Sequence, residues 1–368
     1  MAITITPAEQ QQKDWEKTFI REYIRDSGYR EFMGPEPSNV IQTKKGNTIP
    51  GKSLTLSLAS GLSGDGRSGT DEDLVGNEES LSTYSHQINI NERVHGVLIS
   101  KEQAKYSAAD QRALVGPLLK EWCMNETRND ISDALLMAAS GKTLRAPLNT
   151  LHNEEASVAE KNSWLTDNSD RVLFGNAKTN LVAGDFAASL ASIDSTNDKL
   201  TGARVSLMKR IAKTASPHIR PLRVKGKGRE YFVLFTDTRG FRDVKEDLKN
   251  DNLAGRERNV NSNPVFQDGE LIHDGVIICE IPELPVFAGT GASSIDVSPA
   301  LLCGAQAIAA GWGQLPELTK RNESDYGRKI GRGIEEYIGI SKVQRFRAGE
   351  PLVDHGMVSG FFAGVEDA

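Results

Sequence analysis

Apolar and polar residues alternate along two stretches in the first third of the chain. Leu54, Leu56 and Leu58 alternate with polar residues, and a similar pattern returns over residues 88–99. A period of two is typical of β-strands with one buried face. We therefore expect a long β-hairpin over 48–99, with a glycine-rich, acidic tip. A two-stranded hairpin is marginally stable alone, and because no partner strand follows, we expect it to lie on another chain.

The strongest helical pattern covers residues 101–139, where apolar residues recur at three- and four-residue spacing. A helix of this length would be about 50–60 Å long. Pro117 is expected to kink or restart it, and Gly141 is a suitable C-terminal stop. A second helical stretch is expected over 185–215.

The first 47 residues have the pattern of an arm. Trp15, Phe19 and Tyr23 recur at helical spacing, which predicts a short amphipathic helix near residues 8–26. Such a segment cannot bury its apolar side against itself. We therefore expect the three aromatic side chains to be buried against a neighbouring subunit or against the long helix.

The rest of the chain mixes strand-like and helical segments. Residues 141–183 are polar and irregular apart from an apolar patch at 172–174, and the apolar run 300–310 fits a buried strand or a short helix. Strand-like runs are expected at 219–224, 231–236, 275–281, 338–346 and 358–362.

Charge and composition exclude several classes of protein. The 368 residues include 44 Lys and Arg against 50 Asp and Glu, a net charge of −6, which argues against a general nucleic-acid binder. The three cysteines are far apart, which fits a reducing compartment and argues against a disulfide framework or a zinc ribbon. The N-terminal region is polar, and no apolar run approaches the roughly 18 residues of a membrane span. We expect a soluble protein made in a cytoplasm.

Motifs that could carry chemistry are weak. Residues 64–69 match G-x-G-x-x-G, but the carboxylates within 70–73 would repel a phosphate group. Residues 141–143 resemble the end of a P-loop, but Leu136 stands where that motif needs glycine. The six histidines show no metal-ligand spacing. We expect no catalytic residue, cofactor or metal site, although clustered carboxylates at the hairpin tip could bind a cation adventitiously.

Charge is unevenly distributed along the chain. Nine basic residues and no acidic ones lie within 204–229, whereas the hairpin tip carries six acidic residues and one arginine. The two regions are either solvated faces or complementary contacts between copies of the chain. The candidate contact residues are Asp71, Glu72, Asp73, Glu78 and Glu79 on the acidic side, and Arg220, Arg223, Lys225, Arg328 and Arg332 on the basic side.

Four short motifs occur in a fixed order. They are residues 69–81 (GTDEDLVGNEESL), residues 170–175 (DRVLFG), residues 231–241 followed by Asp243, and residues 263–278, which begin NPVF and end GVII. Together with the order of arm, hairpin, long helix and mixed region, they resemble the tailed-phage major capsid proteins of the Hong Kong 97-type fold. Within that fold they are most similar to the "N-four"-type family.

The resemblance implies an α+β fold in five parts. These are an N-terminal arm (1–47), an extended β-hairpin loop (48–99), a peripheral domain with the spine helix (100–183), an axial domain (184–330) and return strands of the peripheral domain (331–368). In such shells the extended loop lies across the neighbouring subunit.

The resemblance also implies a structural function. The chain would be no enzyme and would need no cofactor. Hexamers and pentamers of it would form the icosahedral head around double-stranded DNA, without sequence-specific binding and without a membrane. Scaffolding and portal proteins, with decoration proteins as a further candidate, would be its partners, and the virion its location.

Two other classes stay open. A tail or portal component would form rings or tubes. A cytoplasmic enzyme with an active site assembled from distant residues would form a small oligomer with a polar-lined pocket. Closed cage-like particles in the electron microscope would favour the capsid interpretation.

Overall fold

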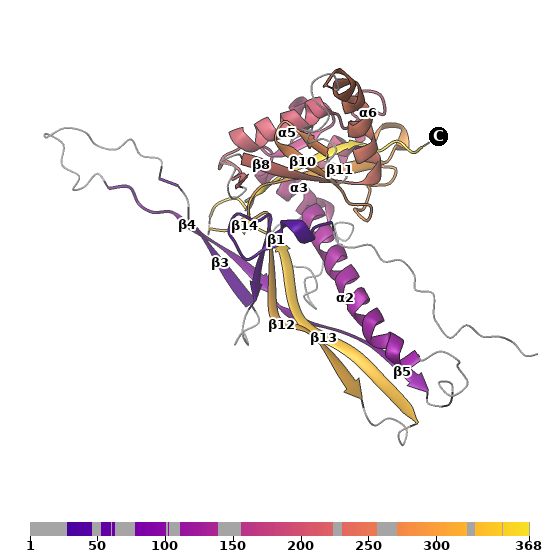
Figure 1. The fold of residues 1–368 in the computed structure, drawn as a ribbon. Helices are drawn as coiled ribbons and strands as arrows, with labels where there is room; N and C mark the ends of the chain where they lie inside the picture. The colour runs from indigo at the N-terminus through magenta and orange to yellow at the C-terminus, as the bar shows by residue number, and fades with distance from the viewer. Residues whose placement is uncertain are drawn as a thin grey trace, which may run out of the picture. The chain divides into compact units, whose positions relative to one another are not determined.

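The computed structural model describes most of the chain as two compact units (Figure 1). One unit, called here the strand–helix unit, comprises residues 92–126 and 315–336, and the other, the sheet unit, comprises 27–91, 127–314 and 337–368. The described residues are 28–45, 53–59, 61–62, 78–100, 102, 111–138, 156–223, 230–255, 271–321, 328–347 and 349–367.

The sheet unit contains a seven-stranded mixed sheet with the path β6-β16-β11-β8-β10-β9, and β7 pairs with β8 at its side. Strand β8 is parallel to β10, and β11 is antiparallel to both β8 and β16. Every residue of β11 and β16 is buried, as expected for strands covered on both faces. The strands are β6 (Val172–Phe174), β7 (Leu222–Arg223), β8 (Glu230–Thr236), β9 (Leu271–His273), β10 (Val276–Glu280), β11 (Val297–Cys303) and β16 (Met357–Ala363).

Alternate residues of β8 point into two different cores. Phe232 and Leu234 are buried with apolar residues of helices α5 (Gly202–Thr214) and α6 (Thr238–Gly255), which Figure 1 shows beside the sheet. Phe235 faces the other core, where its ring lies 4.9 Å from that of Tyr29. Because successive side chains of a strand point to opposite faces, β8 contributes apolar residues to the cores on both faces of the sheet. The shorter helices are α3 (Val158–Asp167), α4 (Phe186–Ala191), η1 (Arg30–Phe32), η2 (Lys178–Asn180) and η6 (Ala292–Ser294).

Short strands from both ends of the chain extend this unit. Strand β2 (Ile41–Lys45) is parallel both to β1 (Met33–Gly34) and to the first residues of β12 (Ile308–Arg321). Strand β14 (Gln344–Arg345) pairs antiparallel with β15 (Val353–Asp354).

The expected hairpin is confirmed in its pairing but not in its extent. Strands β3 (Ser53–Ala59) and β4 (Thr83–Asn89) are antiparallel, with Ser53 opposite Asn89. The returning strand ends at Asn89, and the following residues form β5 (Asn91–Ser100), which belongs to another sheet. The alternation continued past residue 89 because β5 also pairs in a sheet, so the pattern alone could not show the change of partner.

The base of the hairpin rests on its own chain, which corrects the expectation that it needs another chain to lie on. Leu56, Leu58 and Ile88 are buried together with Ala309 and Val343. The hairpin tip, residues 63–77, lies outside the described residues.

The strand–helix unit combines part of a sheet with the long helix. Its strands lie in the order β12-β13-β5, where β13 spans Lys329–Lys342, and helix α2 spans Gln111–Leu136. Helix α2 neither ends nor restarts at Pro117. The buried contacts of Val115 and Leu119 with the strands, on either side of this proline, explain how the helix tolerates one lost backbone hydrogen bond. It ends at Leu136, before the expected stop at Gly141, which lies outside the described residues.

Other expectations are confirmed or corrected segment by segment. The strands expected at 231–236, 275–281 and 358–362 are confirmed as β8, β10 and β16, whereas only two residues of 219–224 form a strand. The irregular segment expected over 141–183 contains α3 and β6, and the single helical stretch over 185–215 is two helices, α4 and α5. The run 300–310 contributes to two strands, β11 and β12.

Candidate functional site

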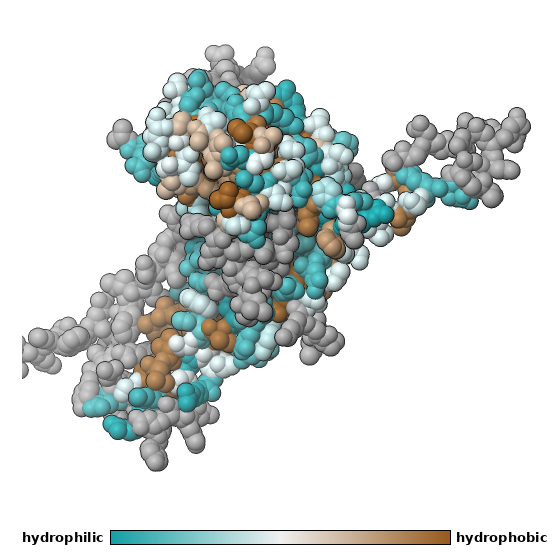
Figure 2. All heavy atoms as spheres, turned by 180° about the vertical axis from the view of Figure 1, so that it is seen from behind, coloured by the Kyte–Doolittle hydropathy of each residue, from teal (hydrophilic) through white to brown (hydrophobic). Residues whose placement is uncertain are grey.

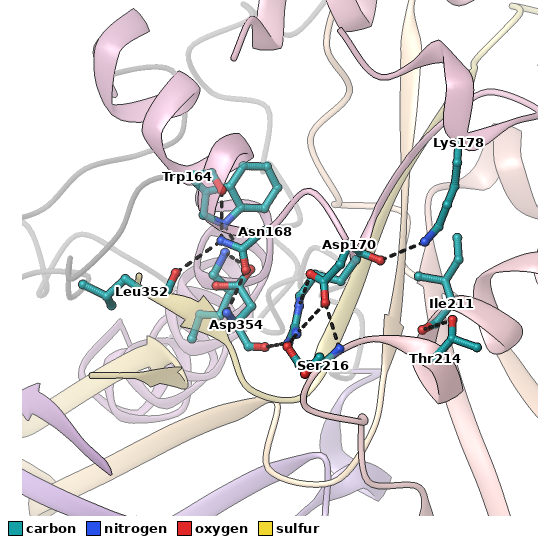
Figure 3. Close-up of polar contacts among 11 residues, drawn as sticks. Trp164, Asn168, Asp170, Lys178, Ile211, Thr214, Ser216, Leu352 and Asp354 are labelled. Atoms are coloured by element: carbon teal, nitrogen blue, oxygen red, sulfur yellow. Dashed lines mark hydrogen bonds and ion pairs between the residues drawn. The ribbon is translucent and has the colours of Figure 1, made fainter. Parts of the chain in front are cut away.

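A buried polar cluster joins helix α3 to the C-terminal strands (Figure 3). The carboxylate of Asp354 accepts hydrogen bonds from Trp164 Nε1 at 3.0 Å and Gln344 Nε2 at 2.9 Å, and it forms an ion pair with Lys342 Nζ at 2.8 Å. The backbone N–H of Asp354 donates to Asn168 Oδ1 at 2.8 Å. Asp354 is only 1% exposed. Burial lowers the pKa of Lys342, and the charge of Asp354 opposes that shift.

A second group of polar contacts continues this cluster. The Arg171 guanidinium donates to the carbonyl oxygens of Asp354 and of Ser216, the latter at 2.9 Å, and pairs with Asp170 at 3.0 Å. Although burial alone would raise it, the pKa of Asp170 is held below its usual value by Arg171 and by the backbone N–H of Ser216. Each of the four carboxylate oxygens of Asp170 and Asp354 already accepts a hydrogen bond. The cluster is therefore arranged as a structural tie.

The strand–helix unit has its own buried ion pair. Arg93 of β5 pairs with Glu336 of β13, and both side chains are buried. Cys123 of α2 donates from Sγ to Glu336 Oε1 at 3.0 Å. Burial, together with this hydrogen bond, raises the pKa of Cys123 to about 12. A thiol with so high a pKa is a poor nucleophile, so this cysteine serves packing.

A third buried acid lies at the start of α6. Asp237 accepts hydrogen bonds from the Gly240 N–H and from Ser298 Oγ, both at 3.0 Å, and burial raises its pKa. This geometry is that of a helix N-cap. Within the described ranges, no group of three or more His, Cys, Asp or Glu residues is placed to hold a metal ion. No helix in the described part of the chain is long and apolar enough to cross a membrane.

One face of the sheet in the strand–helix unit exposes large apolar side chains. Val94 and Leu98 of β5 are 59% and 53% exposed, and Leu315 of β12 is 50% exposed. On β13, Gly331 and Gly333 lie between these strands and carry no side chain. A Cβ on Gly331 would lie 3.1 Å from Arg321 Cβ and 3.7 Å from Leu98 Cδ1. We call Val94, Leu98, Leu315, Gly331 and Gly333 the open face. Figure 2 shows brown, apolar side chains gathered in this part of the chain.

The opposite face of this sheet packs on α2. Ile99 and Ile334 are buried there with Val115 and Leu119 of the helix. Beside this contact lies a hollow of about 440 Å³ with both apolar and charged walls. It is lined by Gly116, Pro117, Lys120, Glu121, Met124, Leu318 and Arg332. Exposed apolar surface rimmed by charged residues is typical of a protein–protein contact.

Only some of the contact residues expected from the sequence lie within the described ranges. Glu78 and Glu79 are exposed ahead of β4, Arg220 is exposed after α5, and Arg328 is exposed immediately before β13. The other two described residues are Arg223, in β7, and Arg332, which lines the hollow. Trp15, Phe19, Tyr23, Asp71, Glu72, Asp73 and Lys225 lie outside the described residues.

Among these residues the structure brings Arg332 to an exposed hollow. The open face was not found from the sequence. Its one readable signal was the Gly-x-Gly pattern at 331 and 333 inside a strand, which often marks a close approach of another group.

Comparison with known proteins gives a consistent result. A family model described as phage capsid protein matches residues 4–359. The capsid asymmetric unit of cyanophage Pam1 is similar, with a TM-score of 0.85 and 32% identity over 100% of both chains. The capsid of Ralstonia phage GP4 has a similar fold, with a TM-score of 0.73 and 19% identity, again over 100% of both chains. No curated protein matches the sequence.

Proposed function

The chain belongs to the phage capsid protein family and is a structural major capsid protein, and we propose that hexamers and pentamers of it form the icosahedral head of a tailed phage. Its place is the virion capsid, where it associates with copies of itself. The tail or portal alternative is not favoured, because the match to capsid proteins covers nearly the whole chain.

The observation that carries the assembly proposal is the open face. Burying a valine or leucine side chain is worth about 1.5–3 kcal/mol relative to leaving it in water. The exposed side chains of Val94, Leu98 and Leu315 therefore favour a protein surface over solvent. In a shell every copy presents the same face, so the same contact is made once per subunit.

The five-part division remains our proposal for the assembled subunit: arm 1–47, extended loop 48–99, peripheral domain 100–183 and 331–368, and axial domain 184–330. Strands β6 and β16, from the two peripheral segments, pair within the same sheet as β8 and β11 of the axial segment. This sheet therefore contains strands from both the proposed peripheral and the proposed axial segments.

We further propose contacts between copies through the arm and the hairpin tip. Trp15, Phe19 and Tyr23 would be buried on a neighbouring subunit. The acidic tip would meet basic residues near Arg220 or near Arg328 of an adjacent copy. One exposed ion pair is worth about 0.2–1 kcal/mol. A weak contact repeated in every subunit lets misplaced subunits leave before the shell closes.

The remaining features of the proposal concern partners and chemistry. Double-stranded DNA would be enclosed without sequence-specific binding, which suits a chain with a net charge of −6 that must not hold the genome tightly. Scaffolding, portal and decoration proteins would join the shell, with assembly in the host cytoplasm. The protein would catalyse no reaction.

Electron microscopy of the purified chain tests the proposal. We expect closed shells of uniform size under conditions that favour assembly, because each subunit would present the same proposed apolar and charged contacts. Rings or tubes would instead support a tail or portal component. A small discrete oligomer at all concentrations would contradict a shell-forming function.

Leu98→Glu should block assembly without unfolding the subunit. Because Leu98 is 53% exposed, the subunit should keep its free energy of unfolding within about 0.5 kcal/mol. Losing an apolar contact worth about 1.5–3 kcal/mol should raise the concentration needed for shells at least tenfold. Light scattering against protein concentration measures this threshold, and Leu98→Met is the control that should assemble normally. An unchanged threshold for Leu98→Glu would remove the open face from the interface.

A further inference from the structure

Two histidines accept hydrogen bonds from neighbouring residues of β14, beside the β3–β4 hairpin. His86 lies in β4 and His355 follows β15, and each accepts a hydrogen bond from a residue of β14. The backbone N–H of Gln344 donates to His86 Nδ1 at 3.3 Å, and the side chain of Arg345 donates from Nε to His355 Nδ1 at 3.1 Å. His86 thus joins the hairpin to β14, whereas His355 joins β14 to the segment after β15. Arg345, the residue held by His355, also lies over the ring of Tyr84 in β4, 5.4 Å from its centroid.

Two further contacts hold the same place. Ser85, next to His86, exchanges backbone hydrogen bonds with Phe346 at 3.1 and 3.2 Å. His86 Nε2 lies 2.7 Å from Ser341 Oγ, and because Nδ1 is an acceptor, the neutral ring carries its hydrogen on Nε2 and donates it to Ser341. Both ring nitrogens of His86 are therefore committed.

This geometry requires neutral imidazole rings. A backbone N–H and a guanidinium N–H can only donate, so neither can accept a hydrogen bond from a protonated Nδ1. Protonation of His86 would place a hydrogen on Nδ1, opposite the backbone N–H of Gln344, and two donors cannot form a hydrogen bond. Protonation of His355 would also add a positive charge beside Arg345.

The surroundings of the two rings are mostly cationic. Burial lowers the pKa of His86 to about 4, although the charge of Asp354 works in the other direction. Burial lowers the pKa of His355 to about 4 as well, and nearby arginines add to the shift. The charged and titratable groups around the pair are Tyr84 on β4, Lys342 on β13, Arg345 on β14, Asp354 on β15, and Arg171 and Arg220 from the sheet unit.

We propose that His86 and His355 form an acid-sensitive latch, which holds the β3–β4 hairpin on the C-terminal strands at neutral pH and releases it when the rings are protonated. The folded-state pKa of about 4 lies below the usual 6.5. The latch is therefore fully effective above pH 6.5 and weakens as pH falls towards 4. The consequence for a shell rests on the proposed function: an extended loop freed at its base would loosen its contact with a neighbour.

Hydrogen exchange on the unassembled full-length chain tests the latch separately from assembly. Between pH 7.5 and 5, amide protection in β3 and β4 should fall after correction for intrinsic exchange rates. The expected fall is about 30-fold for each histidine whose pKa changes from about 4 in the closed state to 6.5 in the released state. Protection in β11 and β16 should stay constant, because the latch acts only at the hairpin base. Unchanged hairpin protection, or an equal loss in all four strands, would overturn the proposal.

Substitutions supply a second readout. His86→Asn with His355→Asn keeps an acceptor near each Nδ1 position but cannot be protonated, so hairpin protection should become independent of pH. His218→Asn, at an exposed histidine, is the matched control and should behave as the wild type. Persistent pH dependence in the double variant would contradict the latch. If that variant does not fold, the wild-type exchange profile alone decides. A chain that forms no shells but shows this exchange pattern would refute only the capsid proposal.

Discussion

Replacing Asp354 with alanine should lower the free energy of unfolding by about 3–5 kcal/mol, because it leaves the ammonium group of Lys342 buried without its partner. Trp164 Nε1 and Gln344 Nε2 would lose their acceptor in the same change. The contact between α3 and the C-terminal strands should therefore be the first to loosen. Denaturant unfolding followed by circular dichroism and by tryptophan fluorescence measures the effect.

Glu350→Ala is the control for this prediction. The ion pair between Arg347 and Glu350 is about half exposed on both sides, so its loss should change stability by less than about 1 kcal/mol. Replacing both Asp354 and Lys342 by apolar residues should recover part of the loss, since no unpaired charge remains. If Asp354→Ala costs no more than Glu350→Ala, the polar cluster is not the structural tie described above.

Deleting residues 62–78 and closing the loop should abolish shell formation while the subunit stays folded. The paired strands end at Ala59 and begin again at Thr83, so the deletion leaves both strands whole. The buried side chains of Leu56, Leu58 and Ile88 also remain on their own chain. Because the base is held within the chain, we expect the tip to serve contacts with another copy.

Two measurements on the deleted protein separate folding from assembly. Its thermal unfolding midpoint should stay within a few degrees of that of the intact subunit, since the buried residues of β3 and β4 are retained. Electron microscopy should show no closed shells at concentrations where the intact chain forms them. Shells of normal size would show that the tip makes no necessary contact.

The sequence by itself determined the elements whose patterns are local. Alternation in 54–58 and 358–362 predicted strands because period two is a property of each strand alone. The family resemblance rested on short motifs and their order. Helix α3 also has a local signal, since Ser157 and Glu160 form a capping box at its N-terminus, but its polar surface hid it from a search for apolar periodicity.

The tertiary structure alone decided which segments became partners. The alternation through residues 88–99 could not show that pairing changes at Asn89, because β4 and β5 have the same local pattern. Nor could it show that Val94 is exposed while Arg93 beside it is buried against Glu336, a residue more than two hundred positions away. Burial of a charge depends on a partner brought from a distant segment. The contact of Asp354 with Trp164 and the contact of His86 with Gln344 also join distant segments, so no local pattern could have predicted them.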